Sequence, residues 1–185
     1  MATDTKQLIA DKLFELITHG GPNSVTVKRL VEECGISRQT FYYHFKDLLD
    51  VLEWGCEQEL ERDVRLSLEA DTPREAIAIF VNQSVARRNV IKRLLQSSYG
   101  MEFFTLMHTS IQGYLWQLFK RSFPNSKLNV SDTEAMLDFC TSGTIGLILQ
   151  NYSRSDLDVD KLVDQIYRLL SGEMNDELFG RTGTE

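Results

Sequence analysis

Six of the seven side chains between residues 38 and 44 can form hydrogen bonds. They are Arg38, Gln39, Thr40, Tyr42, Tyr43 and His44. Arginine and glutamine are the side chains that make paired hydrogen bonds to guanine and adenine edges. Hydroxyl groups, an imidazole ring and an ammonium group suit phosphate oxygens, and Thr40, Tyr43, His44 and Lys46 supply them. These residue types indicate double-stranded DNA as a partner.

The apolar residues around this segment predict a short helix that turns the polar side chains outward. Phe41 and Phe45 are four residues apart, so they share the buried side of a helix. Ser37 is placed to cap that helix, and Ile36 and Phe41 occupy the two positions of a hydrophobic staple. Two adjacent tyrosines on the other side have no obvious packing role. We therefore expect residues 37–45 to form a helix with a polar outer face.

A second short helix precedes this one and completes a helix-turn-helix. An apolar face at helical spacing predicts a helix over residues 27–33, and Thr26 is placed to cap it. Gly35 lies in the tight turn that follows. Two short helices joined by a turn containing glycine are the layout that places the second helix in the DNA major groove. Thr26 and Lys28, at the start of the first helix, are expected to reach the flanking DNA backbone.

The rest of the chain also predicts helices, so the expected fold class is all-α. The three prolines fall between helical patterns, and no segment shows strict polar–apolar alternation. Capping boxes at residues 72–75 and 131–134 open two of the helices. The expected helices cover residues 4–19, 27–33, 37–45, 47–69, 73–86, 89–97, 101–122, 132–152 and 159–171, with a frayed tail at 173–185.

The long helix over residues 47–69 is expected to connect two domains. Apolar residues follow a four-residue step from Leu48 to Leu68. At about 100° per residue, such a ridge drifts by about 40° at each step, so it cannot face one partner throughout. Its start should pack on the first three helices and its end on a different body. The predicted domains are residues 1–46, the helix-turn-helix domain, and 47–185, the helical regulatory and dimerisation domain.

Residues 132–152 and 159–171 are expected to form a homodimer interface. From Met136 onward the first of these segments is apolar on nearly all sides, which indicates burial on several faces. Gly143 and Gly146 allow another backbone to approach closely. With the amphipathic second segment, this predicts a four-helix contact with a second copy. The alternative is a core helix of a monomer.

Aromatic and sulfur-containing side chains gather in the middle of the chain. A ligand cavity between helices is one interpretation, and a plain hydrophobic core is the other. The candidate ligand-binding residues are Phe80, Phe104, Met107, His108, Tyr114 and Cys140.

Composition and motifs argue against several other classes of protein. The three histidines fall on different expected helices, and there is no glycine-rich phosphate loop and no pair of acids beside a nucleophile, so neither a catalytic residue nor a cofactor is expected. The three scattered cysteines, Cys34, Cys56 and Cys140, fit neither a zinc site nor a disulfide framework. No apolar run reaches the roughly 18 residues of a membrane span, and no secretory signal is visible. A cytoplasmic protein is therefore expected.

The charge distribution adds little to the case for DNA. The chain carries a net charge of −7. Residues 1–50 contain six lysines and arginines against seven aspartates and glutamates, a net charge of −1. The expectation of DNA binding therefore depends on the motif and not on a positive field.

Residues 26–45, with the helix before them, resemble the DNA-binding signature of the TetR family. The likeness lies in the apolar spacing of residues 27–34, the Gly-Ile-Ser turn at 35–37 and the Thr-Phe-Tyr-Tyr-His-Phe run at 40–45, and it extends over residues 5–60. It implies a three-helix DNA-binding domain, a connecting fourth helix, and a helical domain for ligand binding and dimerisation. It also implies base contacts from Arg38, Gln39 and Tyr42, and backbone contacts from Thr26, Thr40, Tyr43 and His44.

Two further features concern the segment after the aromatic run. The family pattern has a lysine where this chain has Leu48, and Lys46 is the candidate substitute for its phosphate contact. Residues 45–54 are similar to a subgroup of the family that includes the dihydroxyacetone-kinase operon activator.

The expected function is a ligand-responsive repressor that binds DNA as a homodimer. The effector is expected to change the spacing of the two reading helices, with residues 47–69 as the lever. Four alternatives remain at this point. The chain is an activator, or it is a protein-binding coregulator of the same fold that has lost DNA binding. For the segment itself, the alternatives are a helix-turn-helix reused for protein contact and a small helical domain whose tyrosines simply cover its surface.

Overall fold

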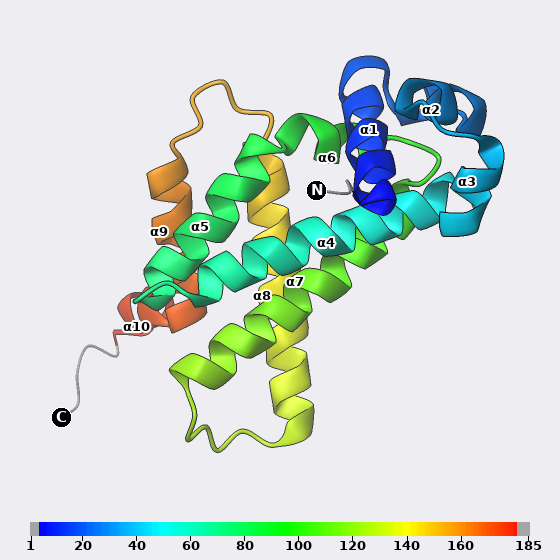
Figure 1. The fold of residues 1–185 in the computed structure, drawn as a ribbon. Coiled ribbons are helices and arrows are strands. Elements are labelled where there is room, and N and C mark those ends of the chain that lie inside the picture. The colour runs from blue at the N-terminus through cyan, green and yellow to red at the C-terminus, as the bar shows by residue number, and fades with distance from the viewer. Residues whose placement is uncertain (1–3, 181–185) are drawn as a thin grey trace. The chain divides into compact units, whose positions relative to one another are not determined.

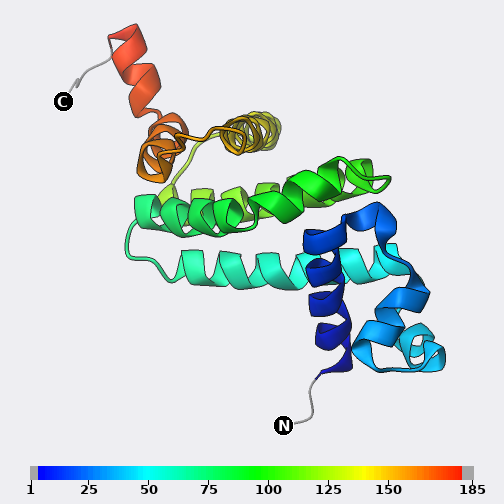
Figure 2. The same cartoon turned by 90° about the horizontal axis from the view of Figure 1, so that it is seen from above.

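The computed structural model describes residues 4–180, and this part of the chain is built from helices with no strand (Figures 1 and 2). The expected all-α fold class is confirmed. The elements are α1 (Thr5–Gly20), η1 (Pro22–Ser24), α2 (Val27–Cys34), α3 (Arg38–His44), α4 (Leu48–Leu68), α5 (Pro73–Ala86), α6 (Arg88–Leu95), α7 (Gly100–Ser122), α8 (Val130–Asn151), α9 (Val159–Ser171) and α10 (Glu173–Phe179).

Side-chain caps explain where several helices begin. The side chains of Asp4, Thr26 and Asp158 each accept a hydrogen bond from a backbone N–H in the first turn of α1, α2 and α9. Before α5, the N–H of Thr72 donates to Glu75 Oε2 and the N–H of Glu75 donates to Thr72 Oγ1, both at 3.2 Å. The predicted capping box at residues 72–75 is thereby confirmed.

The predicted start of α8 is wrong. The capping box expected at residues 131–134 is absent, and Asn129 caps the helix instead. Its Oδ1 accepts a hydrogen bond from Asp132 N at 2.9 Å, and the helix begins at Val130. An asparagine side chain satisfies a free N–H of the first turn as well as a serine does, so the earlier cap moves the start upstream by two residues.

The expected frayed tail is also wrong over residues 173–179, which form α10. Gly172 ends α9 in the left-handed region at a φ of 88°, as a glycine there allows. The N–H groups of Asn175 and Asp176 then donate to Gly172 O at 2.9 and 3.0 Å and start a new helix. Arg168 pairs with Glu177 and ties α10 to α9. Residues 181–185 of the expected tail lie outside the described residues.

The helices group into two compact units. The first contains the described residues up to Arg62 together with Arg87–Met107, and the second contains Asp63–Ala86 with the described residues from His108 onward. Helix α4 contributes residues to both. Residues 87–107 belong to the unit that holds the helix-turn-helix, although they are distant from it in sequence.

The core of the first unit packs α1 against α2, α3, α4 and α6. Ile9, Leu30, Phe41 and Val51 are fully buried within one hydrophobic cluster. A glycine makes the contact between α1 and α4 possible, because a Cβ at Gly55 would lie 2.8 Å from Phe14 Cε2 and 3.2 Å from Ala10 Cβ. The two helices therefore approach at a point where any larger side chain would force them apart.

The core of the second unit is built around a hydrogen-bonded tyrosine. Tyr114 of α7 is almost fully buried and stacks on Phe80 of α5 with ring centroids 4.8 Å apart. Its hydroxyl lies 2.6 Å from Ser67 Oγ, which also donates to Ala76 O at 2.7 Å. These bonds hold the last turns of α4 to α5 and α7.

The apolar ridge expected along α4 changes character within the helix. Leu48, Leu52 and Cys56 pack in the core of the first unit, as the pattern predicts. In the second unit the buried positions of α4 are the polar residues Asp63 and Ser67, not the apolar ones expected at 64 and 68. The hydrogen bonds of Ser67 account for its burial, since a polar group that keeps its partners can leave water.

The close approach at Gly55 leads to a stability prediction. The substitution Gly55→Ala should lower the free energy of unfolding of the first unit by about 1–3 kcal/mol, because the added methyl overpacks the contact with Phe14. Trp54 fluorescence in a Trp116→Phe background, followed during urea unfolding, measures this unit alone. Gly113→Ala is the matched control, since nothing lies within 4 Å of a Cβ there and the helix should gain up to about 1 kcal/mol. Because Gly113 belongs to the second unit, Trp116 fluorescence in a Trp54→Phe background measures this variant. Equal effects at both glycines would contradict the packing described.

Candidate nucleic-acid interface

Helix α3 is placed by a sharp turn and a serine cap. Gly35 adopts a φ of 66°, in the left-handed region that favours glycine after a helix. Its N–H donates to Glu32 O at 3.2 Å, and the N–H of Ile36 donates to Val31 O at 3.1 Å. Ser37 Oγ then accepts a hydrogen bond from Thr40 N at 3.0 Å. The two helices and the turn between them form the helix-turn-helix that the sequence predicts.

Phe41 fixes the rotation of α3 about its own axis. Its side chain is 0% exposed, and Phe45 is also buried in the same cluster. The ring of Phe45 packs edge-on against Trp54 of α4, with centroids 5.9 Å apart. Lys6 Nζ of α1 lies 5.3 Å from the Phe45 centroid and 5.5 Å from that of Trp54, at cation–π distance. The buried side of α3 is thus held by α1 and α4.

The other side of α3 faces away from the core of its unit. Arg38 and Gln39 are exposed, and Tyr42 and Tyr43 keep 58% and 83% of their surface exposed. Such large exposed aromatic side chains on a seven-residue helix are unusual for a surface with no partner. The structure therefore brings these four predicted contact residues together on one accessible surface, which we call the reading face.

The remaining predicted DNA contacts flank this face. Thr40 and His44 are half-buried, and the Thr40 hydroxyl lies 2.9 Å from Ser37 Oγ. Thr26 and Lys28 at the start of α2, and Lys46 after α3, are exposed. Their roles as contacts to bases or phosphates stay predictions.

The segment after Lys46 explains the position of Leu48. Asp47 Oδ1 accepts a hydrogen bond from Asp50 N at 3.0 Å, and Asp50 Oδ2 accepts one from Lys46 N at 2.8 Å. This reciprocal pair fixes the start of α4 directly after α3. Leu48 packs against the core of the first unit, so this position offers no contact to a DNA phosphate. Lys46, two residues earlier and exposed, remains the candidate for that contact.

The predicted ligand-binding residues do not form one group. Phe80 and Tyr114 stack in the core of the second unit, where burial raises the pKa of Tyr114 to about 12 and keeps its hydroxyl protonated at neutral pH. Phe104 and Met107 belong to the first unit, and Met107 packs against its core.

Two members of the predicted set lie near the surface of α7 and α8. His108 Nε2 lies 3.4 Å from Ser142 Oγ. Cys140 lines an apolar pocket in the second unit, and burial raises the pKa of its thiol. This pocket offers space for a ligand, and of the predicted set only Cys140 lines it.

Neither a membrane span nor a metal cluster is found in the part of the chain described. Over residues 4–180, no helix combines the length and the apolar character needed to cross a membrane. No three His, Cys, Asp or Glu side chains of this range are grouped so that they could hold a metal ion.

Comparison with known proteins assigns the helix-turn-helix. Residues 9–52, which span α1 to the start of α4, match the family model described as bacterial regulatory proteins, tetR family. This N-terminal segment is therefore a TetR-family helix-turn-helix. The resemblance inferred from residues 26–45 is thereby confirmed.

Two curated TetR-like regulators match parts of the chain. The HTH-type transcriptional regulator YuxN of Bacillus subtilis is 29% identical over 77 residues, which are 40% of this chain and 26% of YuxN. The HTH-type transcriptional regulator AcrR of Shigella flexneri is 23% identical over 103 residues, which are 55% of this chain and 45% of AcrR. The chain thus spans less than half the length of these curated relatives.

Solved structures share the fold over nearly the whole chain. The dihydroxyacetone kinase operon activator DhaS has a TM-score of 0.68 at 15% identity, with 92% of this chain and 96% of DhaS covered. The fatty acid degradation regulator FadR of Bacillus halodurans has a TM-score of 0.65 at 20% identity, with 93% and 97% covered. These likenesses show the fold of a TetR-family protein, with an N-terminal helix-turn-helix followed by a helical domain. These relatives and neighbours are described as regulators or as an operon activator.

Sequence reasoning missed residues that hold the reading face in place. Lys6, Trp54 and Gly55 all pack behind α3 or between α1 and α4. A glycine in the middle of a long predicted helix is the one signal that pointed to a close contact. Nothing in the local pattern shows that Lys6 lies over two aromatic rings.

The cap of α3 leads to a second stability prediction. Ser37→Ala should lower the free energy of unfolding of the first unit by about 1 kcal/mol, because Thr40 N loses its acceptor. Ser37→Asp should retain most of the stability, since a carboxylate caps as well as a hydroxyl. Trp54 fluorescence in the Trp116→Phe background measures both variants. A Ser37→Asp protein as unstable as Ser37→Ala would contradict a capping role.

Proposed function

We propose that this TetR-family chain is a sequence-specific DNA-binding transcriptional regulator that acts as a homodimer and responds to a small molecule. The observation that carries the proposal is the reading face. Arg38, Gln39, Tyr42 and Tyr43 are exposed together because Phe41 is buried behind them. A recognition helix in the major groove needs such a set of exposed hydrogen-bonding side chains on a rigid support.

The proposed contacts divide into two classes. Arg38, Gln39 and Tyr42 contact base edges and give sequence preference. A second class holds the duplex through its phosphates without reading sequence, and it comprises Thr26, Lys28, Thr40, Tyr43, His44 and Lys46. Because residues 1–50 carry a net charge of −1, the affinity should depend more on base contacts and less on counterion release than in a strongly basic domain.

A binding experiment tests the reading face. Arg38→Ala and Tyr42→Ala should each weaken binding to duplex DNA flanking the encoding gene by about 10-fold or more. Arg93→Ala, which removes an exposed arginine of α6 in the same unit, should bind as the wild type does. Footprinting locates the site first, and gel-shift titration then measures the dissociation constants at one salt concentration.

Two outcomes would contradict the assignment. Wild-type affinity in both reading-face variants would place the contacts elsewhere. No specific binding by the wild type would favour the second candidate, a coregulator of the same fold that binds proteins, which the nearly neutral charge of the first 50 residues supports.

The proposed dimer uses α8 and α9 of the second unit. The exposed side of α8 carries small residues around one large one, with Gly143 open to solvent and Phe139 80% exposed. Leu169 adds an exposed apolar side chain on α9. Small residues let two helices approach closely, and an exposed phenylalanine favours burial against a partner. Two copies related by a two-fold axis would present two reading helices to one duplex.

Oligomeric state tests this arrangement. Gly143→Glu should weaken dimerisation by about 100-fold or more, because it buries an unpaired charge at the centre of the contact. Gly113→Glu on α7 is the matched control, since a Cβ there also meets nothing within 4 Å. Sedimentation equilibrium measures both. A dimer that is equally stable in the two variants would rule out this face.

A small-molecule response completes the proposal. FadR of Bacillus subtilis, similar in fold with a TM-score of 0.55 at 17% identity and coverage of 88% of this chain and 96% of FadR, was solved in complex with stearoyl-CoA. In this chain α4 and α7 both have residues in both units, so a ligand of the second unit could act on the first through either helix, and α4 is the proposed lever because it follows α3 directly. We propose repression released by the effector, with activation as the alternative sign.

A further inference from the structure

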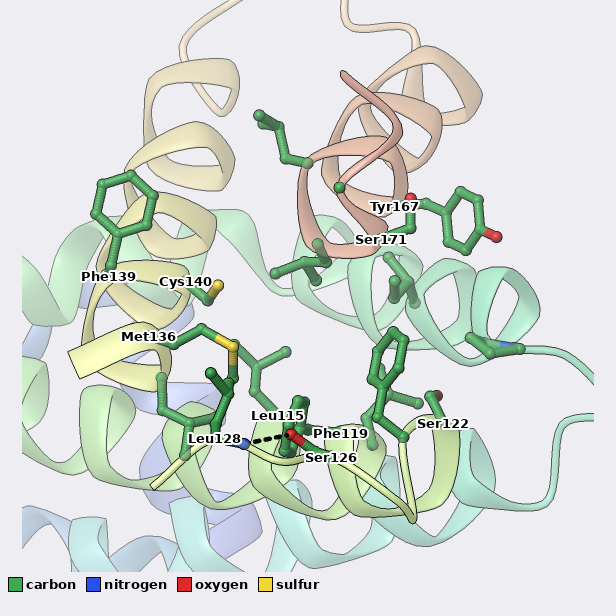
Figure 3. Close-up of a pocket in the computed structure, with 18 of the residues that line it drawn as sticks. Leu115, Phe119, Ser122, Ser126, Leu128, Met136, Phe139, Cys140, Tyr167 and Ser171 are labelled. Carbon is green, nitrogen blue, oxygen red and sulfur yellow. Dashed lines mark hydrogen bonds between the residues drawn. The ribbon is translucent and has the colours of Figure 1, made fainter. Parts of the chain in front are cut away.

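The second unit contains a pocket of about 800 Å³. It lies among the start of α5, the end of α7, the segment between α7 and α8, the first half of α8, the last turns of α9 and the start of α10 (Figure 3). This volume is within the range of roughly 300–1,000 Å³ that small-molecule sites occupy. The pocket shares only Cys140 with the ligand-binding residues predicted from the sequence.

The walls of the pocket are mostly apolar, with a few uncharged polar side chains. Leu115, Leu118 and Leu137 are buried and form the deeper part, while Phe123 and Leu128 are about half exposed. Figure 3 shows Met136 and Cys140 of α8 on one side of the space, with Tyr167 and Ser171 of α9 on the other. The sulfur atoms of Met136 and Cys140 point toward the interior. Such walls stabilise an apolar ligand body by removing it from water.

Among the described residues 4–180, no charged side chain lines this pocket. A carboxylate or ammonium group that enters it would lose its water without gaining an ion pair, and that desolvation is costly. The lining therefore selects an uncharged molecule.

One buried hydroxyl of the lining lacks a hydrogen-bond partner. Ser122 Oγ, at the end of α7, is buried and unpaired, whereas Ser126 Oγ accepts a bond from Leu128 N at 3.3 Å and Ser171 Oγ lies 3.4 Å from Arg168 O. A rotation about the Cα–Cβ bond of Ser122 takes its hydroxyl between staggered positions. A ligand hydroxyl or carbonyl near Ser122 would supply the missing partner.

We propose that this pocket binds an uncharged, elongated apolar molecule with a single hydroxyl or carbonyl group, held with that group at Ser122. The inference rests on the ligand response in the proposed function and names the site and the chemical class of the ligand. A second copy of this chain is the other occupant to test, because Phe139 belongs both to the pocket and to the proposed dimer face.

The binding experiment uses the full-length chain without DNA. The neutral dye N-phenyl-1-naphthylamine should become fluorescent on binding, and decan-1-ol should displace it. Decanoate and decyltrimethylammonium, which have the same chain length and a charge, should displace it at least 10-fold less well. Equal displacement by all three would overturn the proposed selection for an uncharged ligand.

Substitutions locate the dye within the structure. Cys140→Phe fills the pocket and should abolish dye binding, while Gln150→Phe adds the same ring at an exposed position of α8 and should leave it unchanged. Circular dichroism establishes that both variants are folded. Dye binding that survives Cys140→Phe in a folded protein would place the site elsewhere and overturn the proposal.

The hydroxyl of Ser122 is tested against another buried, unpaired hydroxyl. Thr141 Oγ1 also has no partner, but Thr141 does not line the pocket. Both Ser122→Ala and Thr141→Val should raise the Tm of the free protein by about 2 °C or more, because each removes an unsatisfied group. Only Ser122→Ala should weaken decan-1-ol binding, by about 3- to 10-fold. Unchanged affinity in Ser122→Ala would overturn the assigned role of this hydroxyl.

A second copy of the chain in the pocket, instead of a ligand, would give a different result in the dye assay. If the dye binds only after Gly143→Glu has produced a monomer, the partner chain covers or fills the pocket and the proposal is wrong. Because these assays contain no DNA, loss of operator binding would contradict the proposed function and leave this result intact. If only dye binding were lost, the proposed ligand site would be wrong and the proposed DNA binding would be unaffected.

Discussion

The burial of Phe41 is the interaction on which the candidate interface depends. A helix of seven residues is too short to be stable alone, so packing must hold α3 in place. Phe41 is fully enclosed and Phe45 lies beside it, against Trp54. Because that side of α3 is fixed against the core, the helical period turns the other side outward. The side chains on that side are Arg38, Gln39, Tyr42 and Tyr43. The polar surface is thus a consequence of the apolar anchor.

The second unit shows a different balance between packing and exposure. Its inner side is closed by Tyr114, which is bonded to Ser67 and stacked on Phe80. Its α8 side is open, with Phe139 exposed next to a pocket that has apolar walls. A contiguous apolar surface exposed to water is unfavourable, and it usually marks a place where a partner or ligand binds. A partner chain over α8 and a neutral ligand in the pocket together would account for this surface.

Local signals in the sequence predicted most helix ends and the reading face. Thr72 and Pro73 marked the start of α5, Gly172 marked the end of α9, and the spacing of Phe41 and Phe45 predicted which side of α3 is buried. Two neighbouring polar residues can both cap a helix, so the pattern could not choose Asn129 over Ser131. The burial of Asp63 and Ser67 depends on partners that are distant in sequence. The pocket could not be predicted for the same reason, because its walls come from five helices whose packing no local pattern specifies.

The contact between α3 and the bases of an operator is the most direct test of the account. Duplex operator that contains 5-iododeoxyuridine can be crosslinked to the protein by light, and trypsin then cuts after Arg38 and Lys46 to release residues 39–46. Mass spectrometry should find the crosslink in this peptide, at Tyr42, the tyrosine assigned to a base contact. Crosslinks found only in other peptides of the chain would contradict the account.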